Sequence, residues 1–333
     1  MVRDILDKAL QGAELFPEEV GELMNAPLPS PEAEKIRNTA FLKSVSAGDE
    51  TAEIHLRIEL DVSPCQTNCR FCPFATEHNL VKKRSELSLK KAVAQAVQGV
   101  ADGANALVLV CTGAYPFAQF VEAATEIRDH APRGTVLIAH LGDLSKKQAQ
   151  DLRRAGFLGF YHAIRLREGR DTNISIDRRR ATLRYAEDAG LLLGTGVEPV
   201  GGEHTAEELV ERTMWTNIVN PVYSGAVARL NPPGGEFSER GAVNEARLCH
   251  LLAVIRLALN YDVPGLYTDA PSLNRCRAGA NLLWAEPDGQ TPTMRRLFGA
   301  RRNRTIADCR RVLTKAGWKL LEGPSRIFHH VES

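Results

Sequence analysis

The chain has 333 residues, 44% apolar and 25% charged, which is the composition of an ordinary soluble globular protein. Its formal net charge of +1 gives no bulk electrostatic attraction to nucleic acid or to an anionic membrane. No apolar run is long enough to span a bilayer, and the N-terminus lacks the apolar core of a signal peptide. We therefore expect a cytoplasmic protein without a nucleic-acid or membrane partner. The seven cysteines, an odd number, fit a reducing compartment and metal binding better than a disulfide framework.

The N-terminal part is polar and has apolar residues at near-helical spacing, as at Leu15, Phe16, Val20 and Leu23. This pattern predicts a helical extension over residues 1–45 that caps the rest of the chain.

From Ile54 onward, short apolar segments typical of strands alternate with amphipathic segments typical of helices. The expected strands are 54–60, 106–111, 135–140, 159–164, 191–198, 222–230, 265–268 and 280–284. The expected helices include 90–102, 117–130, 146–155, 177–189, 206–216 and 244–259. Eight such pairs predict an α/β fold, a (β/α)8 TIM-type barrel domain over residues 46–333 with a C-terminal helical tail. In such barrels the active site lies at the carboxyl ends of the strands.

Three cysteines, Cys65, Cys69 and Cys72, lie within eight residues directly after the first expected strand. Three thiolates on one loop can converge on a single metal centre. A structural zinc ion or an electron-transfer cluster normally has four protein ligands. Either a distant residue such as Cys111 or Cys276 supplies the fourth ligand, or one iron stays open for a small molecule. A structural metal knuckle or three ordinary buried thiols are the alternatives, although a knuckle seldom begins a long alternating chain.

The spacing Cys-x3-Cys-x2-Cys, with Phe71 just before the last cysteine, resembles the signature of the radical S-adenosylmethionine (SAM) enzymes. The resemblance implies a [4Fe–4S] cluster on the three cysteines and a fourth iron chelated by the amino and carboxylate groups of SAM. It also implies that one electron cleaves SAM to methionine and a 5′-deoxyadenosyl radical, which abstracts hydrogen from an unactivated carbon. The protein then binds, orients and shields the reactants.

The resemblance extends to the biotin-synthase-like branch of that superfamily over roughly residues 50–320. Gly113 and Ala114 follow the second strand and are similar to the turn where backbone groups hold the amino group of SAM. Small residues let the backbone approach a ligand there. The pair Gly202 and Glu203 is similar to the glycine-rich segment that contacts the adenine.

The fourth strand ends in a charged run, which must face a polar cavity or water because unpaired charge in a barrel wall is costly. In this run, the resemblance implies that Glu168 binds the ribose hydroxyls and that Arg165 binds a carboxylate. The resemblance also implies an arginine in the next helix that pairs with the methionine carboxylate of SAM. Its position falls on Arg179, and Arg180 is the next residue. A guanidinium suits a carboxylate because its fork can donate two parallel hydrogen bonds.

Several residues depart from biotin synthase. That enzyme has a second, [2Fe–2S] cluster, and Cys111 matches its first cysteine, but the next two positions are Ile138 and Gly194. We therefore do not expect that cluster or the synthesis of biotin. Cys111 and Cys276 remain candidates for an auxiliary cluster or for substrate contact. Glu198 replaces an apolar residue and is either a substrate contact or a paired core carboxylate.

The sequence is compatible with two enzyme functions, and it does not decide between transferase, lyase and mutase chemistry. In the favoured one, the chain needs only the SAM cluster and performs a rearrangement, cleavage or carbon transfer in cofactor biosynthesis, similar to the methylornithine-synthase and hydrogenase-maturation enzymes. The arginines imply a small, anionic substrate. The alternative is sulfur insertion of the lipoyl- or biotin-synthase type, which needs an auxiliary iron–sulfur cluster. A non-catalytic iron–sulfur scaffold or electron carrier is a third interpretation.

The expected partners are a small-molecule or carrier-bound substrate and an electron donor such as flavodoxin or ferredoxin. A homodimer is also compatible with the sequence.

Overall fold

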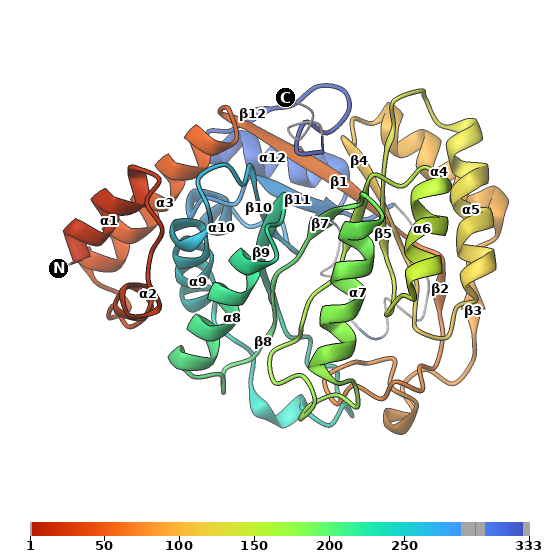
Figure 1. The fold of residues 1–333 in the computed structure, drawn as a ribbon, viewed down its shortest axis with the longest axis horizontal. Coiled ribbons are helices and arrows are strands. Elements are labelled where there is room, and N and C mark those ends of the chain that lie inside the picture. Colours follow the sequence, from red (N-terminus) through yellow and green to blue (C-terminus); the bar gives the residue numbers. More distant parts are fainter. Residues whose placement is uncertain (1, 288–296, 298–303, 329–333) are drawn as a thin grey trace.

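Three helices precede a barrel of alternating strands and helices (Figure 1). The computed structural model describes residues 2–287, 297 and 304–328. In this part of the chain we find no helix with the length and apolar character that a membrane crossing requires. The division into an extension at 1–45 and a barrel domain at 46–333 stays a prediction, and residues 329–333 lie outside the described part.

The N-terminal helices are α1 (Val2–Leu10), α2 (Pro17–Met24) and α3 (Pro31–Ala47). Their apolar faces pack against α9 (Glu245–Ala258) in one buried cluster. The buried amine of Lys43 on α3 donates hydrogen bonds to the carbonyls of Leu257 (2.9 Å) and Leu259 (2.8 Å). These carbonyls at the end of α9 have no partner within the helix, so Lys43 joins the two elements.

Eight parallel strands close the barrel, because each pairs with the next and the last pairs with the first. They are β1 (Thr51–Glu59), β4 (Ala106–Val110), β5 (Val136–His140), β6 (Gly159–Tyr161), β7 (Leu192–Gly194), β9 (Tyr223–Ala228), β10 (Gly265–Thr268) and β11 (Leu282–Ala285). The predicted barrel is therefore confirmed. The expected strand 191–198 is instead divided into β7 and β8 (Val197–Val200), both of which pair with β9. The break falls at Thr195 and Gly196, and glycine in a strand interior weakens the ladder.

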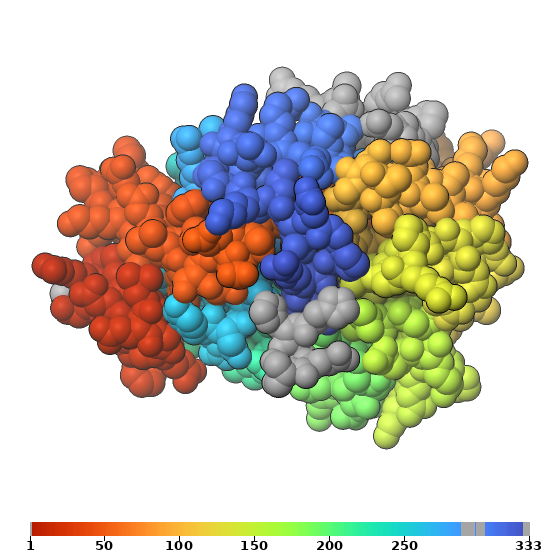
Figure 2. Space-filling model, turned by 90° about the horizontal axis from the view of Figure 1, so that it is seen from above, coloured from red at the N-terminus to blue at the C-terminus, as the bar shows by residue number. Residues whose placement is uncertain are grey.

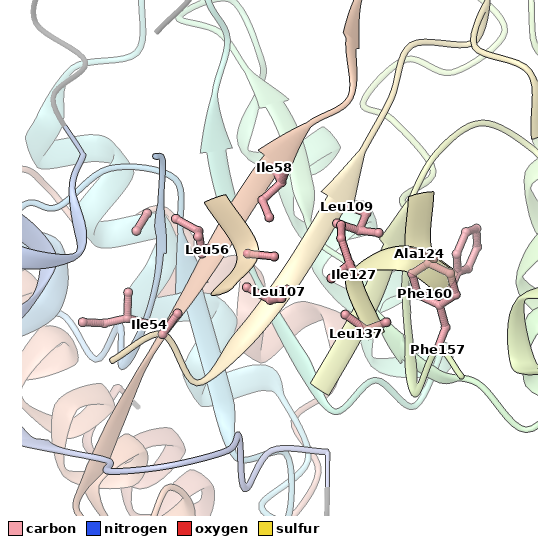
Figure 3. Close-up of a cluster of buried hydrophobic side chains, with 14 of the residues drawn as sticks. Ile54, Leu56, Ile58, Leu107, Leu109, Ala124, Ile127, Leu137, Phe157 and Phe160 are labelled. Carbon is pink, nitrogen blue, oxygen red and sulfur yellow. The ribbon is translucent and has the colours of Figure 1, made fainter. Parts of the chain in front are cut away.

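The surrounding helices are α4 (Leu89–Ala101), α5 (Phe117–His130), α6 (Lys146–Arg154), α7 (Ile176–Asp188), α8 (Ala206–Ile218), α9, α10 (Leu273–Arg277) and α12 (Ile306–Ala316). The side chains of Ser145, Ser175 and Thr205 accept hydrogen bonds from backbone N–H groups in the first turns of α6, α7 and α8. A layer of apolar side chains lies between strands and helices, and Figure 3 shows Ile54, Leu56 and others in it. Since Leu56 faces this layer, its neighbour Arg57 faces the barrel lumen.

Short elements complete the two ends. β2 (Asp61–Val62) pairs with β3 (Ser85–Glu86), and the 3-10 helices η1 (Thr76–His78) and η2 (Ser238–Arg240) lie in other connecting loops. At the amino end, β12 (Lys319–Leu320) pairs with the start of β1, which therefore begins three residues before the expected strand. Figure 2 shows this end, where the dark blue C-terminal segment lies between the orange start of the barrel and the yellow-green helices.

Candidate functional site

The three clustered cysteines lie in a loop that begins at the carboxyl end of β1. Backbone hydrogen bonds close this loop, from Cys65 N to Phe74 O (2.7 Å) and from Thr76 N to Cys65 O (3.1 Å). Burial raises the pKa of Cys69 to about 11 and the pKa of Cys72 to about 12. Because the thiolate is the form that binds metal, iron binding must release these protons.

The three thiols are the donor type that holds iron–sulfur clusters. Among the described residues, no group of three or more His, Cys, Asp or Glu side chains is arranged to hold a single metal ion. The charge of Cys65 acts on the other two thiols, and that of Cys69 acts on Cys72, so the three are neighbours.

A glycine turn lies beside the first of these cysteines. A Cβ added at Gly113 would lie 3.2 Å from Cys65 Sγ, so glycine keeps this approach open. The turn is fixed by Asp61, a buried carboxylate that accepts hydrogen bonds from Thr112 N (2.7 Å) and Thr112 Oγ1 (2.6 Å). Gly113 and Ala114 are exposed, as backbone that contacts a ligand must be. Phe71 is half-buried in the cysteine loop.

The cysteine loop contacts the charged run after β6, where Arg70 N donates to Asp171 O (2.9 Å). Burial raises the Cys69 pKa, and the positive charges of Arg165 and Arg179 oppose this rise. The side chain of Glu168 is fully buried and accepts hydrogen bonds from Arg179 Nε (3.0 Å) and Arg165 N (2.9 Å). Arg180 instead lies 4.8 Å from the centre of the Trp215 ring. The structure therefore brings Arg179 to the cysteine loop, whereas Arg180 points away from it.

Asp143 and His162 belong to the same network and were missed in the sequence. Asp143 accepts hydrogen bonds from Arg179 Nη1 (3.0 Å) and His162 Nε2 (3.1 Å). Burial favours a higher pKa for Asp143, but the His162 hydrogen bond and the Arg179 charge lower it to about 2. Burial lowers the pKa of His162 to about 4. The available signal was the position of Asp143 just after one expected strand and of His162 near the end of the next one.

The expected adenine segment follows β8. Gly202 is exposed, and the Glu203 carboxylate forms an ion pair with Arg229. Burial would raise the Glu203 pKa, but the Arg229 hydrogen bond lowers it below its ordinary value. Arg229 also donates to Asn231 Oδ1 (2.8 Å), so the segment is held against the end of β9. His204 accepts a hydrogen bond from Gly201 N (2.9 Å).

Glu198 is a paired carboxylate at the edge of the barrel lumen. It forms an ion pair with Arg165 and accepts a hydrogen bond from Tyr267 Oη (3.2 Å). Tyr267 is in turn hydrogen-bonded to Tyr161. Arg165 therefore lies between this chain of side chains and the cysteine loop, whose Cys69 pKa it affects.

Aromatic side chains fill the lumen below this edge. The Tyr267 and Trp284 rings stack with centroids 4.7 Å apart, and Tyr161 meets Trp284 at 5.0 Å. A Cβ added at Gly194 would lie 2.2 Å from Tyr223 Cζ. Tyr223 thus covers Gly194, one of the two positions where the sequence lacks the cysteine expected for an auxiliary cluster.

The two further candidate cysteines lie in different surroundings. Cys111 is at the carboxyl end of β4, where burial and the charge of Asp61 raise its pKa. Cys276 is fully buried on α10 in the helical layer, and its carbonyl accepts a hydrogen bond from Trp318 Nε1 (3.2 Å). Burial and the charge of Cys309 raise the pKa of Cys276. Cys276 lies within the short helix that precedes β11, and its part in an auxiliary cluster stays a prediction.

Comparison with known proteins gives distant relatives over part of the chain. The biotin synthase of Kocuria rhizophila is 28% identical over 62% of this chain and 45% of that protein. The biotin synthase of a Nocardioides species is 31% identical over 62% of this chain and 57% of that protein. The chain thus matches about half the length of these curated relatives. No family model matches it.

Solved structures match over nearly the whole chain. Methylornithine synthase (PylB) has a TM-score of 0.82 at 17% identity, covering 97% of this chain and 98% of that one. HydG, a maturase of the [FeFe]-hydrogenase, has a TM-score of 0.79 at 16% identity, covering 96% of this chain and 75% of that one. These likenesses establish the fold. The chain is a distant homologue of biotin synthases in the radical SAM superfamily.

Membership of the radical SAM superfamily implies a [4Fe–4S] cluster and SAM as cofactors. The cysteine loop, with the Gly113 turn beside it, is the part of the described structure whose donor set fits the cluster. The assignments of individual residues to SAM are taken up as proposals below.

Proposed function

We propose that this radical SAM protein is an enzyme that cleaves SAM reductively at a [4Fe–4S] cluster held by Cys65, Cys69 and Cys72. The observation that carries the proposal is the contact between the cysteine loop and the charged run that holds the buried pair Glu168 and Arg179, through the hydrogen bond from Arg70 N to Asp171 O (2.9 Å). A thiol loop and a charged binding network then share the carboxyl end of one barrel, where barrel enzymes have their active sites. An iron–sulfur protein that only carries electrons has no need of such a network.

The residues around the loop would hold SAM by its polar groups. Backbone groups at Gly113 and Ala114 would receive its amino group, and Arg179 its carboxylate. Arg179 has five N–H donors, so it can remain bonded to Glu168 and Asp143 and still contact a ligand. Glu168 would accept hydrogen bonds from the ribose hydroxyls.

Other residues would complete this binding site. Phe71 would pack beside the cluster, and the Gly202–Glu203 segment would face the adenine. When bound, the cluster supplies the electron that splits SAM into methionine and a 5′-deoxyadenosyl radical, which abstracts hydrogen from the substrate. The lumen residues keep water away from the reacting atoms, because the aromatic rings of Tyr161, Tyr267 and Trp284 fill the space below.

The substrate would be a small anionic molecule of cofactor biosynthesis, and the reaction a rearrangement or carbon transfer. The positive charge of Arg165 is the reason to expect an anionic substrate, because this residue pairs with Glu198 at the lumen and its charge also acts on Cys69. Sulfur insertion needs an auxiliary cluster, and Tyr223 covers the Gly194 position where one of its ligands would stand. The electron would come from a donor protein such as flavodoxin or ferredoxin.

The test is anaerobic turnover of SAM with a chemical reductant, comparing Cys69→Ala with the matched variant Cys249→Ala. Cys249 lies on α9 among the N-terminal helices, far from the loop in sequence and in a separate buried cluster. We expect 5′-deoxyadenosine from the wild type and from Cys249→Ala, and none above background from Cys69→Ala. Full activity in Cys69→Ala, or a loaded wild type that leaves SAM intact, would refute the proposal.

A further inference from the structure

Three neighbouring side chains of the lumen carry buried nitrogen atoms that lack hydrogen-bond partners among the described residues. They are Arg57 Nε, His140 Nδ1 and Trp284 Nε1, from β1, β5 and β11. The Arg57 guanidinium lies 5.2 Å from the centre of the Trp284 ring. The His140 ring lies 5.8 Å from the same ring. The three open nitrogens thus surround one part of the lumen.

This part of the lumen extends from the middle of the barrel toward the carboxyl end, where the cysteine loop begins. Trp284 is paired in register with His55, and Arg57 lies further along β1 toward the carboxyl end. His140 is the last residue of β5. The charges of Arg57 and Arg165 both act on His140, and that of Arg165 also acts on Cys69 and Cys72. A molecule bound here would therefore lie between the aromatic floor and the predicted cluster.

Two of the open atoms can only donate. An indole N–H and a guanidinium N–H have no acceptor capacity, and burying a donor without a partner costs free energy. Unpartnered atoms also occur deeper in the lumen at His55 and Tyr223, but an imidazole or a phenol can donate or accept. The donor pair at Arg57 and Trp284 therefore suits a ligand that supplies acceptors.

The number of donors favours a carboxylate. The Arg57 side chain is 15% exposed, and its hydrogen bond to Glu59 uses Nη2 at 3.3 Å, which leaves Nε open. One open guanidinium N–H and one indole N–H match the two oxygens of a carboxylate. Burial and the neighbouring arginine charges lower the pKa of His140 well below its ordinary value, so its imidazole is neutral near pH 7. A phosphate would bring more charge and more acceptors than these groups satisfy.

We propose that Arg57, His140 and Trp284 bind a carboxylate group of the substrate, which is then a compact carboxylic acid. This inference rests on the proposed function, because the molecule held here is the one from which hydrogen is abstracted. Arg57 and Trp284 donate to the two oxygens, and His140 borders the same group. The remainder of the substrate extends toward Arg165 and the cysteine loop.

The test uses 19F NMR of the full, reconstituted chain labelled with 5-fluorotryptophan. The chain has three tryptophans, and Trp284→Phe identifies the Trp284 resonance by its loss. Propanoate is the probe, with propanamide and inorganic phosphate as comparison ligands. We expect propanoate to shift the Trp284 resonance in a saturable way, and Arg57→Gln to weaken this binding at least about tenfold. Propanamide should bind at least about tenfold more weakly than propanoate.

Internal controls separate binding from misfolding. The indole of Trp318 donates to Cys276 O, so its resonance should not respond to propanoate and reports whether Arg57→Gln is folded. If that variant does not fold, Arg57→Lys takes its place and should weaken binding to a similar degree. Arg180→Gln, a substitution beside Trp215, should leave the Trp284 response unchanged.

Three results would overturn the inference. They are no response of Trp284 to propanoate, an equal response to propanamide, and tighter binding of phosphate. SAM cleavage measured on the same sample distinguishes a failure of the carboxylate site from a failure of the proposed function. Cleavage without a Trp284 response refutes the carboxylate site alone. A Trp284 response that depends on Arg57, without cleavage, refutes the proposed function and leaves a carboxylate-binding lumen.

Discussion

At the amino end of the barrel, the buried carboxylate of Glu53 accepts hydrogen bonds from Ser325 Oγ and from the backbone N–H groups of Arg326 (2.8 Å) and Ile327 (3.1 Å). Further along the same strand, Arg57 has a buried nitrogen with no such partner among the described residues. Both side chains face the lumen, but Arg57 keeps one N–H group without a hydrogen-bond partner among the described residues. The C-terminal segment closes one end of the barrel, whereas the proposed ligand site lies toward the other end.

This difference separates residues that stabilise the fold from residues that bind. At the amino end, a Cβ added at Gly159 would lie 2.3 Å from Phe328, so the C-terminal segment is tightly packed against the barrel. At the carboxyl end, loops carry the cysteines, the glycine turn and the charged network. Substitutions at the two ends should therefore have separable effects on stability and on SAM cleavage.

The largest effect is expected at the carboxyl end for Arg179→Gln. The change leaves the buried carboxylates of Glu168 and Asp143 without their shared cation, which should cost about 4 kcal/mol of unfolding free energy. If Arg179 binds the SAM carboxylate, SAM cleavage should also fall at least about a hundredfold. Chemical denaturation and 5′-deoxyadenosine formation measure the two effects.

Arg180→Gln is the matched control, because Arg180 is exposed and stacks on Trp215. It should retain nearly all activity. Equal losses in the two variants would contradict the assignment of Arg179.

At the amino end, Glu53→Ala should lower the unfolding free energy by about 3 kcal/mol, since it leaves buried donors of His55 and the C-terminal segment unpaired. SAM cleavage per folded molecule should be preserved. The control Glu50→Ala removes an exposed partner of Lys319 and should not change stability measurably. A loss of SAM cleavage in folded Glu53→Ala would show that the two ends are not separable.

A smaller effect concerns the pH dependence of stability. The folded pKa of His162 is lowered to about 4 by burial, whereas the unfolded value is about 6.5. The unfolded chain therefore binds a proton first as the pH falls, and stability present above pH 6.5 is lost between about 6.5 and 4. The loss attributable to His162 should be at most about 3 kcal/mol.

His162→Gln should reduce this loss relative to the wild type, measured by urea unfolding across the pH range. His130→Gln, at an exposed histidine of α5, should not alter the slope. Identical pH profiles for the wild type and His162→Gln would contradict the buried, neutral state of His162.

The sequence predicted most of the barrel because its strands alternate with amphipathic helices. It did not predict the break between β7 and β8, since apolar residues stand on both sides of Gly194-Thr195-Gly196 and a short glycine-containing segment can also lie within one strand. The Cys-x3-Cys-x2-Cys spacing predicted the cysteine loop because those residues are local in sequence. The sequence did not predict that Cys276 lies on a helix, because α10 has only five residues and shows no helical period.

The lumen residues could not be predicted in the same way. Alternation with Leu56 and Ile58 does place Arg57 on the inner face of its strand. However, His140 and Trp284 come from strands far away in sequence, and only closure of the barrel brings the three together. The pairing of Glu198 with Arg165, and of Glu168 with Arg179, likewise depends on distances across the mouth of the barrel.

The most direct measurement is an iron and sulfide count with Mössbauer spectroscopy on the anaerobically reconstituted chain and on the triple variant Cys65→Ala, Cys69→Ala and Cys72→Ala. A single SAM cluster predicts about four irons per wild-type chain and none in the variant. An iron–sulfur cluster that remains in the variant would contradict a single site at the cysteine loop. It would show ligation elsewhere, with Cys111 and Cys276 as the first candidates, and would favour sulfur insertion.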